Sequence, residues 1–209
     1  MRMQGLIDSL KEYLPYRKLL ESISDTNSVQ QIHTLDSVRS IYIASLWHHL
    51  SHPLVIITPR SEDARHLFDS LLTYVGNKAP LHLFAESEIL PYERVAYDSN
   101  ITNQRLMALA SLVLNRETSQ PSLIISSVSA ALRYTLPVNV FQSNISNIAL
   151  SQTLRLDETI RRWVSLGYKH ETNVEIPGTF SRRGGILDIY PPTSHLPVRI
   201  EMVGNTVDT

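Results

Sequence analysis

The stretch SRRGG, residues 181–185, carries two adjacent arginines and directly precedes an apolar segment, residues 186–190, that reads as a strand. Neighbouring strand residues point to opposite faces, so at least one of the two guanidinium groups must point outward. The glycine pair permits an unusual backbone, such as a bulge that re-aims a side chain. Arginine binds carboxylates through a planar fork and is a frequent interface anchor.

Two interpretations of this stretch stay open on the residues alone. One is a basic binding patch that consists of Arg183 with Arg182, Lys169 and His170. The other is a solvated strand edge whose arginines form ion pairs with Glu171 or Glu175. Residue chemistry favours the second, because surface ion pairs are common and contribute only about 0 to 1 kcal/mol.

A nucleotide-binding loop would follow the pattern G-x-x-x-x-G-K and then Ser or Thr. The matching register is HTLDSVRS, and its defining positions hold His33, Val38, Arg39 and Ser40. Only the last of these fits. Val38 disfavours the positive φ that glycine allows, and Asp36 places a negative charge where phosphate would lie. We predict that this loop does not bind ATP, and that Asp36 or Ser37 caps an ordinary helix.

Two further groups of side chains could in principle support a metal or acid–base site. His48, His49 and His52 lie on a predicted helix, where an i, i+4 pair can bind zinc. No carboxylate stands near them in the sequence, so we predict a solvated helix face. Glu86, Glu88 and Glu93 surround Pro91 in a polar loop, and we expect them to be exposed. With no nucleophile and base pattern, we expect neither catalysis nor a cofactor in this chain.

Composition excludes several protein classes. The net charge of −1, from 19 basic and 20 acidic residues, provides no overall electrostatic footprint for nucleic acid. The chain has no cysteine, which excludes disulfides and thiolate metal sites. No segment approaches the roughly 18 apolar residues of a membrane span, and the N-terminus lacks a signal-peptide core. We therefore expect a soluble cytoplasmic protein that binds no membrane.

The first part of the chain alternates helices with apolar strands. Helical spacing and apolar runs predict helices over 1–20 (broken near Pro15), 41–50, 61–75 (capped by Ser61, ended by Gly76) and 103–115, with strands over 53–59, 81–84 and 122–127. Apolar strands that do not alternate and are separated by helices indicate a parallel sheet buried on both faces. The fold class is α/β.

The pattern changes after Pro137. One helix over 154–168 precedes alternating strands over 185–190 and 198–204, which indicates an α+β domain with antiparallel pairing. We predict two domains, residues 1–137 and 138–209. Residues 203–207 read as a strand, a tight turn and the start of a partner strand, so we expect the second domain to be truncated.

One block carries a specific motif, G-x-F/Y-x-x-R-G-x-x-(I/L)-D-(I/L)-(F/Y)-P, followed by P-x-R-I-E and a V-D pair. The matching residues are Gly178, Phe180, Arg183, Gly184, Asp188, Tyr190 and Pro191, then Pro197, Arg199, Glu201, Val207 and Asp208. On this block the chain resembles the N-terminal, UvrB-like module of the bacterial transcription-repair coupling factors, the Mfd family, over most of residues 30–209. The resemblance implies a helicase-like α/β domain with a degenerate P-loop, followed by a smaller α+β domain that binds UvrA, the damage-recognition ATPase of nucleotide excision repair.

For residues 181–185 the resemblance favours the basic binding patch over the solvated strand edge, because it implies that Arg183 belongs to the UvrA-contacting face. The chain departs from UvrB at Ser181 and His170, where UvrB has arginines. Both residues stay in the predicted UvrA-binding set with Arg183, Arg182 and Lys169. The interval Pro91–Gln104 is too short for the DNA-contacting hairpin of UvrB. Its aromatic residues, Tyr92 and Tyr97, are expected to pack rather than to stack on bases.

The sequence thus predicts a non-catalytic recruitment module that carries UvrA to RNA polymerase stalled at DNA damage. The resemblance implies that RNA polymerase, DNA, ATP and Mg bind to parts of the full-length protein outside this chain, and it suggests that distant domains could mask the UvrA-binding face. The alternatives are an ATP-binding UvrB or helicase fragment, which a nucleotide titration would reveal, and a direct DNA-binding module, whose affinity would fall steeply with salt.

Overall fold

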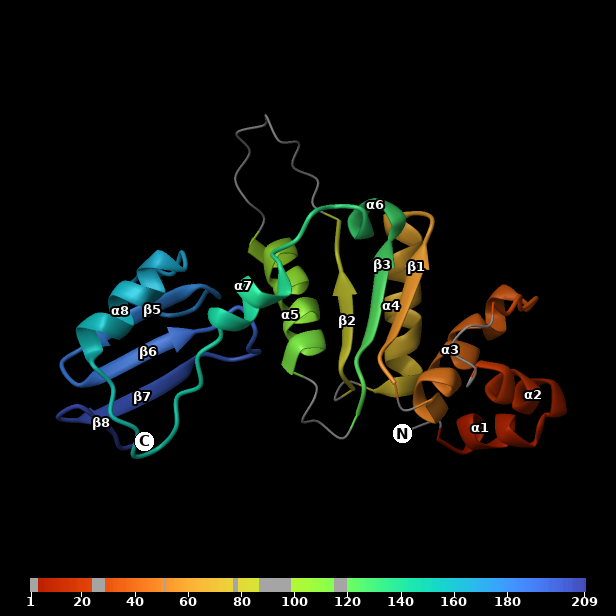
Figure 1. Ribbon diagram of the computed structural model, residues 1–209, viewed down its shortest axis with the longest axis horizontal. Coiled ribbons are helices and arrows are strands. Elements are labelled where there is room, and N and C mark those ends of the chain that lie inside the picture. Colours follow the sequence, from red (N-terminus) through yellow and green to blue (C-terminus); the bar gives the residue numbers. More distant parts are fainter. Residues whose placement is uncertain (1–3, 24–28, 51, 77–78, 87–98, 115–119) are drawn as a thin grey trace. The chain divides into compact units, whose positions relative to one another are not determined.

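The computed structural model describes residues 4–23, 29–50, 52–76, 79–86, 99–114 and 120–209. The chain forms two compact units: unit 1 comprises Met1–Ala96 and Ala108–Arg133, and unit 2 comprises Tyr97–Met107 and Tyr134–Thr209. Figure 1 labels most of their helices and strands. The division into domains 1–137 and 138–209 stays a prediction, because compactness does not show that either part folds independently.

Unit 1 is built on three parallel strands, β1 (Leu54–Thr58), β2 (Leu81–Phe84) and β3 (Leu123–Ser127), in the spatial order β1-β3-β2. All residues of the central strand β3 are buried. Helix α4 (Ser61–Val75) connects β1 to β2, and α5 (Ser99–Leu114) connects β2 to β3. A short helix, α6 (Val128–Ala131), follows β3 directly. The predicted α/β class with a parallel sheet is confirmed.

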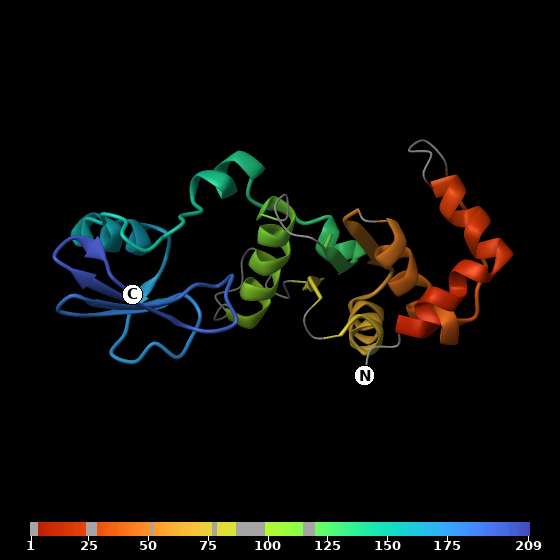
Figure 2. The same ribbon diagram turned by 90° about the horizontal axis from the view of Figure 1, so that it is seen from below.

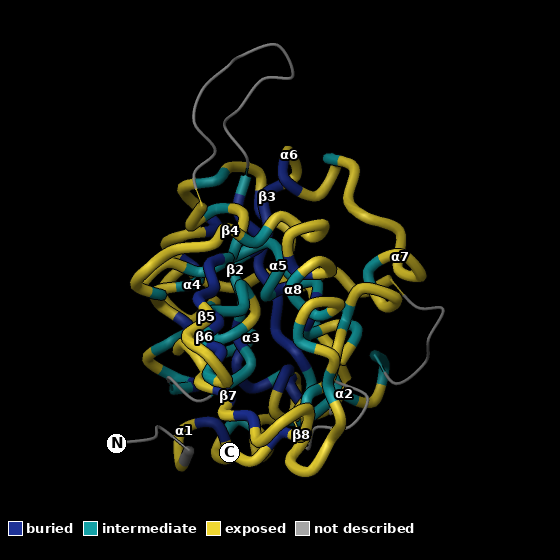
Figure 3. Tube along the Cα trace, turned by 90° about the vertical axis from the view of Figure 1, so that its left-hand side faces the viewer, coloured by how far each residue is buried: buried dark blue, intermediate teal, exposed yellow. Residues whose placement is uncertain are grey.

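The two faces of this sheet are covered unequally, and Figure 3 shows the burial along the chain. On one face, Leu71 of α4 and Trp47 of α3 (Asp36–Leu50) pack with the strands. On the other face, Ala108 of α5 packs against Phe84 and Ile124. On this second face the edge strand β1 is not covered, and its Val55 and Ile57 are 52% and 56% exposed. The prediction that the sheet is buried on both faces is therefore wrong for β1.

The N-terminal residues form α1 (Gln4–Ser9), the 3₁₀ turn η1 (Leu10–Glu12) and α2 (Leu14–Ile23). The predicted break near Pro15 is confirmed. Pro15 occupies the first turn of α2, where its missing N–H needs no partner. Tyr16 of the same turn is fully buried and meets Tyr42 of α3 edge to face, with 5.3 Å between the ring centroids.

The sequence predicts the end of helix α4 correctly but not its N-cap. Gly76 has a φ of 78°, and its N–H donates to the carbonyl of Leu72 at 2.9 Å. At the other end, the N-cap residue is Arg60, without a side-chain cap bond. Ser61 is already the first helical residue, so the prediction that it caps α4 is wrong.

Unit 2 is an α+β fold around a five-stranded sheet. Its strands, in the spatial order β4-β5-β6-β7-β8, are β4 (Lys169–His170), β5 (Thr179–Arg183), β6 (Ile186–Tyr190), β7 (Val198–Val203) and β8 (Thr206–Val207). All neighbours pair antiparallel except β4 and β5, which are parallel. Helices α7 (Val138–Ser143) and α8 (Leu156–Ser165) precede the sheet. The predicted antiparallel pairing of β6 with β7 is confirmed.

Helix α8 covers one face of this sheet, as Figure 2 shows. Its Trp163 packs with Phe180, Leu187 and Ile200 of the three central strands. The predicted turn at Gly204-Asn205 is confirmed, because Val203 pairs with Thr206 across it. The described part of the chain contains no helix long and apolar enough to cross a membrane.

The glycine pair at 184–185 forms a two-residue hairpin turn between β5 and β6. Arg183 pairs directly with Ile186, so the ladder between β5 and β6 has no bulge at this turn, although the glycine pair would permit one. Gly184 has a φ of 63°, and Gly185 is outside the positive-φ region, as in a type II′ turn. This turn keeps the right-handed twist of the hairpin, and no extra residue is needed to redirect the arginines.

Candidate functional site

The register of the unit 2 sheet distributes the predicted patch over two faces. Residues directly opposite each other on paired strands point to the same side. Arg182 is opposite Leu187, and His170 is opposite Phe180, so both lie on the side covered by α8. Arg183 and Lys169 alternate with them and lie on the other face, which we call the open face. The structure thus brings Arg183 and Lys169 to one face and separates them from Arg182 and His170.

Arg183 is exposed at the end of β5. Its Nη2 donates to the carbonyl oxygen of Thr172 at 2.8 Å, which ties the preceding loop to the strand. Among the described residues it forms no ion pair with Glu171 or Glu175. The solvated-edge interpretation named those two carboxylates, and neither is used. The Arg183 guanidinium is therefore exposed and, in the part of the chain that the structure describes, not neutralised by a carboxylate in an ion pair.

The Arg182 guanidinium makes its contacts within unit 2. Its Nη1 forms an ion pair with the Asp157 carboxylate of α8 at 2.9 Å, and its Nε donates to the Gly184 carbonyl at 3.4 Å. The Arg182 side chain is 40% exposed. This arginine links the β5–β6 turn to α8, so its charge is already matched.

Ser181 and Asp188 lie opposite each other on the open face, and Arg199 lies beyond Asp188. Arg199 forms a bidentate interaction with Asp188, in which its Nε donates to Oδ1 at 2.7 Å and its Nη2 donates to Oδ2 at 3.0 Å. This hydrogen bonding is the main cause that lowers the pKa of Asp188, and the charge of Arg183 contributes in the same direction. Ser181 is only 3% exposed, so a partner cannot reach its hydroxyl directly.

His170 uses its ring in packing. It meets Phe180 edge to face, with 5.4 Å between the ring centroids. Tyr190 donates its hydroxyl to the His195 carbonyl at 2.8 Å. These aromatic groups support the sheet and its loops.

The segment that matches the phosphate-loop register, residues 33–40, is the entry to α3. Asp36 is the first helical residue, so neither it nor Ser37 is the cap, and that prediction is wrong. The Asp36 carboxylate instead forms an ion pair with Arg39 one turn later. In the described residues no strand precedes this helix, so the strand–loop–helix arrangement of a P-loop is not formed there.

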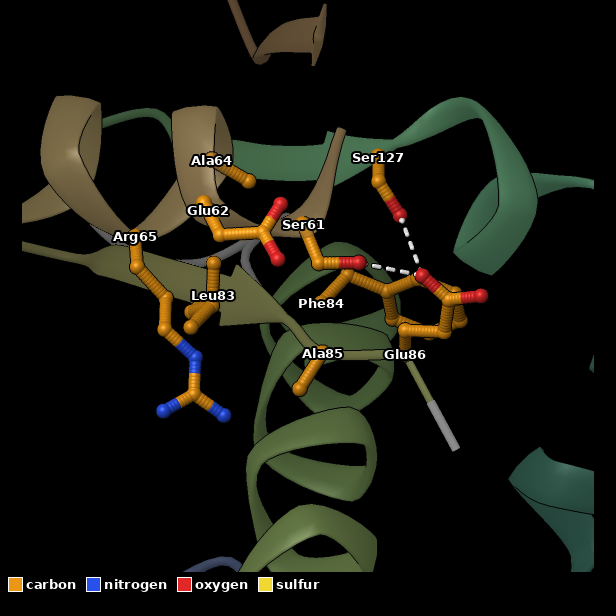
Figure 4. A pocket seen from close by; sticks show the side chains of 9 residues that line it. All are labelled: Ser61, Glu62, Ala64, Arg65, Leu83, Phe84, Ala85, Glu86 and Ser127. Carbon is orange, nitrogen blue, oxygen red and sulfur yellow. Dashed lines mark hydrogen bonds between the residues drawn. The ribbon is translucent and has the colours of Figure 1, made fainter. Parts of the chain in front are cut away.

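A pocket of about 290 Å³ lies at the carboxyl ends of the unit 1 strands (Figure 4). The Glu86 carboxylate accepts hydrogen bonds from three hydroxyl groups: that of Ser61, that of Ser129 at 2.8 Å and that of Ser127 at 3.3 Å. The Ser61 bond is the largest cause that lowers the pKa of Glu86. The guanidinium of Arg65 points away from this carboxylate. Glu88, Glu93, Tyr92 and Tyr97 lie outside the described residues.

The Glu86 cluster occupies the edge at which open α/β sheets bind ligands. Its hydroxyl donors are the kind of group that binds a phosphate, and here they face a carboxylate from the same chain. A carboxylate with a lowered pKa is ionised at neutral pH and repels another anion. Sequence reasoning missed this cluster, because its members come from three separate segments that only the parallel sheet brings together.

Helices α1 and α3 bring together Asp8, His48 and His49, whose ligand atoms all lie within 4.8 Å of one another. The sequence showed no carboxylate near these histidines, and the fold supplies one from 40 residues earlier. His52 lies outside α3, so no i, i+4 histidine pair forms on this helix, and the prediction of a solvated helix face is wrong for His49, whose Nε2 is buried. Burial is the main cause that lowers the pKa of His49 to about 4.

Comparison with known proteins agrees with the motif in unit 2. Residues 147–209 match the family model described as the UvrB interaction domain. The chain is 29% identical to the transcription-repair-coupling factor of Bacillus subtilis (strain 168) over 209 residues, which covers 99% of this chain and 17% of that protein. It is 32% identical to the same factor of Myxococcus xanthus over 201 residues, covering 93% and 16%.

The resemblance to the transcription-repair-coupling factors is confirmed. A third such factor, from Staphylococcus aureus (strain USA300), is 25% identical over 173 residues and extends the agreement to a more distant relative. The chain spans only 17% and 16% of the lengths of the first two coupling factors. The matched UvrB interaction domain contains α8 and every strand of the unit 2 sheet, including Arg183.

Proposed function

We propose that this chain is a non-catalytic recruitment module that binds UvrA and thereby brings nucleotide excision repair to RNA polymerase stalled at damage. The observation that carries the proposal is the exposed Arg183 guanidinium on the open face, inside the segment that matches the UvrB interaction domain. The names of the relatives, which couple transcription to repair, support the same role.

The open face offers a cation in a defined position. The bond to the Thr172 carbonyl restricts the Arg183 side chain before any partner arrives, which reduces the entropy lost on binding. The remaining N–H groups can bind a carboxylate in a planar fork. Asp188 does not compete strongly for this cation, because Arg199 already neutralises it.

Lys169 provides a second cation on the same face. It lies opposite Thr179, four positions before Arg183 along β5, which corresponds to roughly 13 Å at the rise of a strand. A partner that uses both cations needs two acidic groups at a similar separation. The UvrA surface bound by this face should therefore be acidic, and the association should weaken at high salt.

The test is a pull-down of UvrA by the 209-residue chain and by an Arg183→Ala variant. We expect the variant to lose at least tenfold in affinity, because Arg183 is exposed and, within the described part of the chain, its guanidinium forms no ion pair. The matched control is Arg155→Ala, since Arg155 is a 77% exposed arginine of the same unit that pairs with Glu158 next to it. Failure of the unaltered chain to capture UvrA rejects the proposal. Equal losses for both variants would reject the assignment to Arg183.

The non-catalytic part of the proposal is supported by unit 1. Val38 stands where a nucleotide loop needs glycine, and the Glu86 carboxylate faces the hydroxyl donors at the ligand-binding edge of the sheet. We propose that ATP and Mg, like RNA polymerase and DNA, bind to parts of the longer protein outside this chain. Titration with ATP tests this point: measurable affinity would favour the rival interpretation as a helicase-type ATP-binding fragment.

A further inference from the structure

The N-terminal helices hold a cluster of side chains that UvrA recruitment does not use. Asp8 comes from α1, and His48 and His49 come from the last turn of α3. Each offers one ligand atom, and these atoms lie within 4.8 Å of one another. We propose that Asp8, His48 and His49 form a binding site for a divalent transition metal ion of the zinc class.

The donor set determines the class of ion. Two imidazole nitrogens and one carboxylate oxygen are the ligands that zinc shares with cobalt and nickel, whereas magnesium and calcium prefer oxygen ligands alone. Three protein ligands leave a fourth position for water. The chain has no cysteine, so no thiolate competes for the ion.

The environment of His49 points to ligation by its Nε2 atom. The Tyr16 hydroxyl lies 2.8 Å from Nδ1 of His49, so this nitrogen is already engaged. Nε2 is buried and has no hydrogen-bond partner among the described residues. If Nδ1–H donates to the tyrosine oxygen, Nε2 carries the lone pair that a metal needs. Ligating histidines in proteins are commonly oriented by such a bond at the other ring nitrogen.

The spacing of the cluster is close to what a metal ion needs. Ligands that surround a tetrahedral zinc ion at about 2.0 to 2.1 Å lie roughly 3.4 Å from one another, and the three ligand atoms here already lie within 4.8 Å of one another. Asp8 and His48 are exposed, and His49 is oriented by its contact with Tyr16. The positive charge of Lys11 near His49 opposes a cation, and the Asp8 carboxylate offsets it. The ion would tie α1 to α3.

The experiment is a titration of the metal-free 209-residue chain with cobalt chloride, followed by displacement with zinc chloride. We expect saturation at one ion per chain, visible d–d absorption of a tetrahedral nitrogen and oxygen site, and a higher melting temperature with zinc. Asp8→Asn and His48→Gln should each weaken binding at least tenfold. Both residues are exposed, so both variants should fold, and far-UV circular dichroism checks this.

The matched control is His66→Gln, since His66 is an exposed histidine on α4 outside the cluster. It should bind cobalt as the unaltered chain does. The proposal is overturned if the chain binds no cobalt at one equivalent. It is equally overturned if Asp8→Asn and His48→Gln leave the affinity unchanged, or if His66→Gln lowers it as much as they do.

Discussion

Replacing Gly185 with alanine should destabilise unit 2, and the cause lies in the neighbouring strand. A Cβ atom at position 185 would lie 2.8 Å from the backbone carbonyl oxygen of Met202 on β7. Carbon–oxygen contacts in sheets are roughly 3.3 Å or longer, so the two backbones would have to separate by about half an ångström. That separation strains the 2.8 Å bond from the Met202 N–H to the Gly185 carbonyl.

The expected loss in the free energy of unfolding is about 2 kcal/mol. Overpacking against a backbone atom costs roughly 1 to 3 kcal/mol. A weakened backbone hydrogen bond costs up to about 1 kcal/mol more. Against this, alanine restricts the unfolded chain and returns roughly 0.4 to 1 kcal/mol. Because the turn carries Arg183, the same change should also weaken UvrA capture.

Urea denaturation monitored by tryptophan fluorescence reports on the core of each unit through its own tryptophan. The chain has two tryptophans, Trp47 in the unit 1 core and Trp163 in the unit 2 core. In a Trp47→Phe background, Gly185→Ala should lower the Trp163 midpoint by about 2 M urea, at a slope near 1 kcal/mol/M. The control is Gly5→Ala, whose Cβ meets nothing within 4 Å and which should leave the Trp163 transition unchanged. An unchanged Trp163 midpoint for Gly185→Ala would refute the reasoning.

Three further predictions concern the pairs that surround the candidate sites. The lowered pKa of Asp188 means that its ionised carboxylate stabilises the folded state; this stabilisation is fully present above the ordinary aspartate pKa and is lost as the pH falls through the lowered pKa of the folded state. Asp188→Asn should therefore remove this part of the pH dependence of stability, measured from Trp163 unfolding at a series of pH values. Parallel pH profiles for the variant and the unaltered chain would contradict the assignment. Glu86→Ala removes the acceptor of three hydroxyls and should lower the stability of unit 1 by about 1 kcal/mol, read from Trp47 in a Trp163→Phe background; no change would mean that water replaces the carboxylate at no cost. Asp157→Ala removes the partner of Arg182 and should cost less than about 1 kcal/mol while UvrA capture stays unchanged. A large change in capture would contradict this and show that the Arg182–Asp157 pair influences binding.

Local patterns in the sequence were sufficient for most elements of the fold. The apolar run at 122–127 predicted the central strand β3, and Gly76 predicted the end of α4. The turn at Gly204-Asn205 predicted the β7–β8 hairpin. These features depend on intrinsic backbone preferences and on side-chain periodicity, which neighbouring residues express without help from distant parts of the chain.

The helix starts and the coverage of the sheet were less predictable. Ser61 has the side chain of a cap residue, but its hydroxyl binds Glu86, which is 25 positions away. The apolar run in β1 reads as a fully buried strand, but Val55 and Ile57 are half exposed at a sheet edge. The composition of a strand does not state its place in a sheet, because that place depends on which other strands and helices pack beside it.

The sequence by itself determined that Arg183 follows a strand, precedes a glycine turn and lies in a motif of the UvrB interaction domain. Only the tertiary structure decided which arginine has a partner. The strand register separates Arg182 from Arg183, α8 supplies Asp157 to the first, and Arg199 neutralises Asp188 beside the second. The Arg199–Asp188 pair joins residues 11 positions apart, and the Arg182–Asp157 pair joins residues 25 positions apart. Such pairs cannot be predicted from the sequence alone, because the folded sheet sets the distances between the charges.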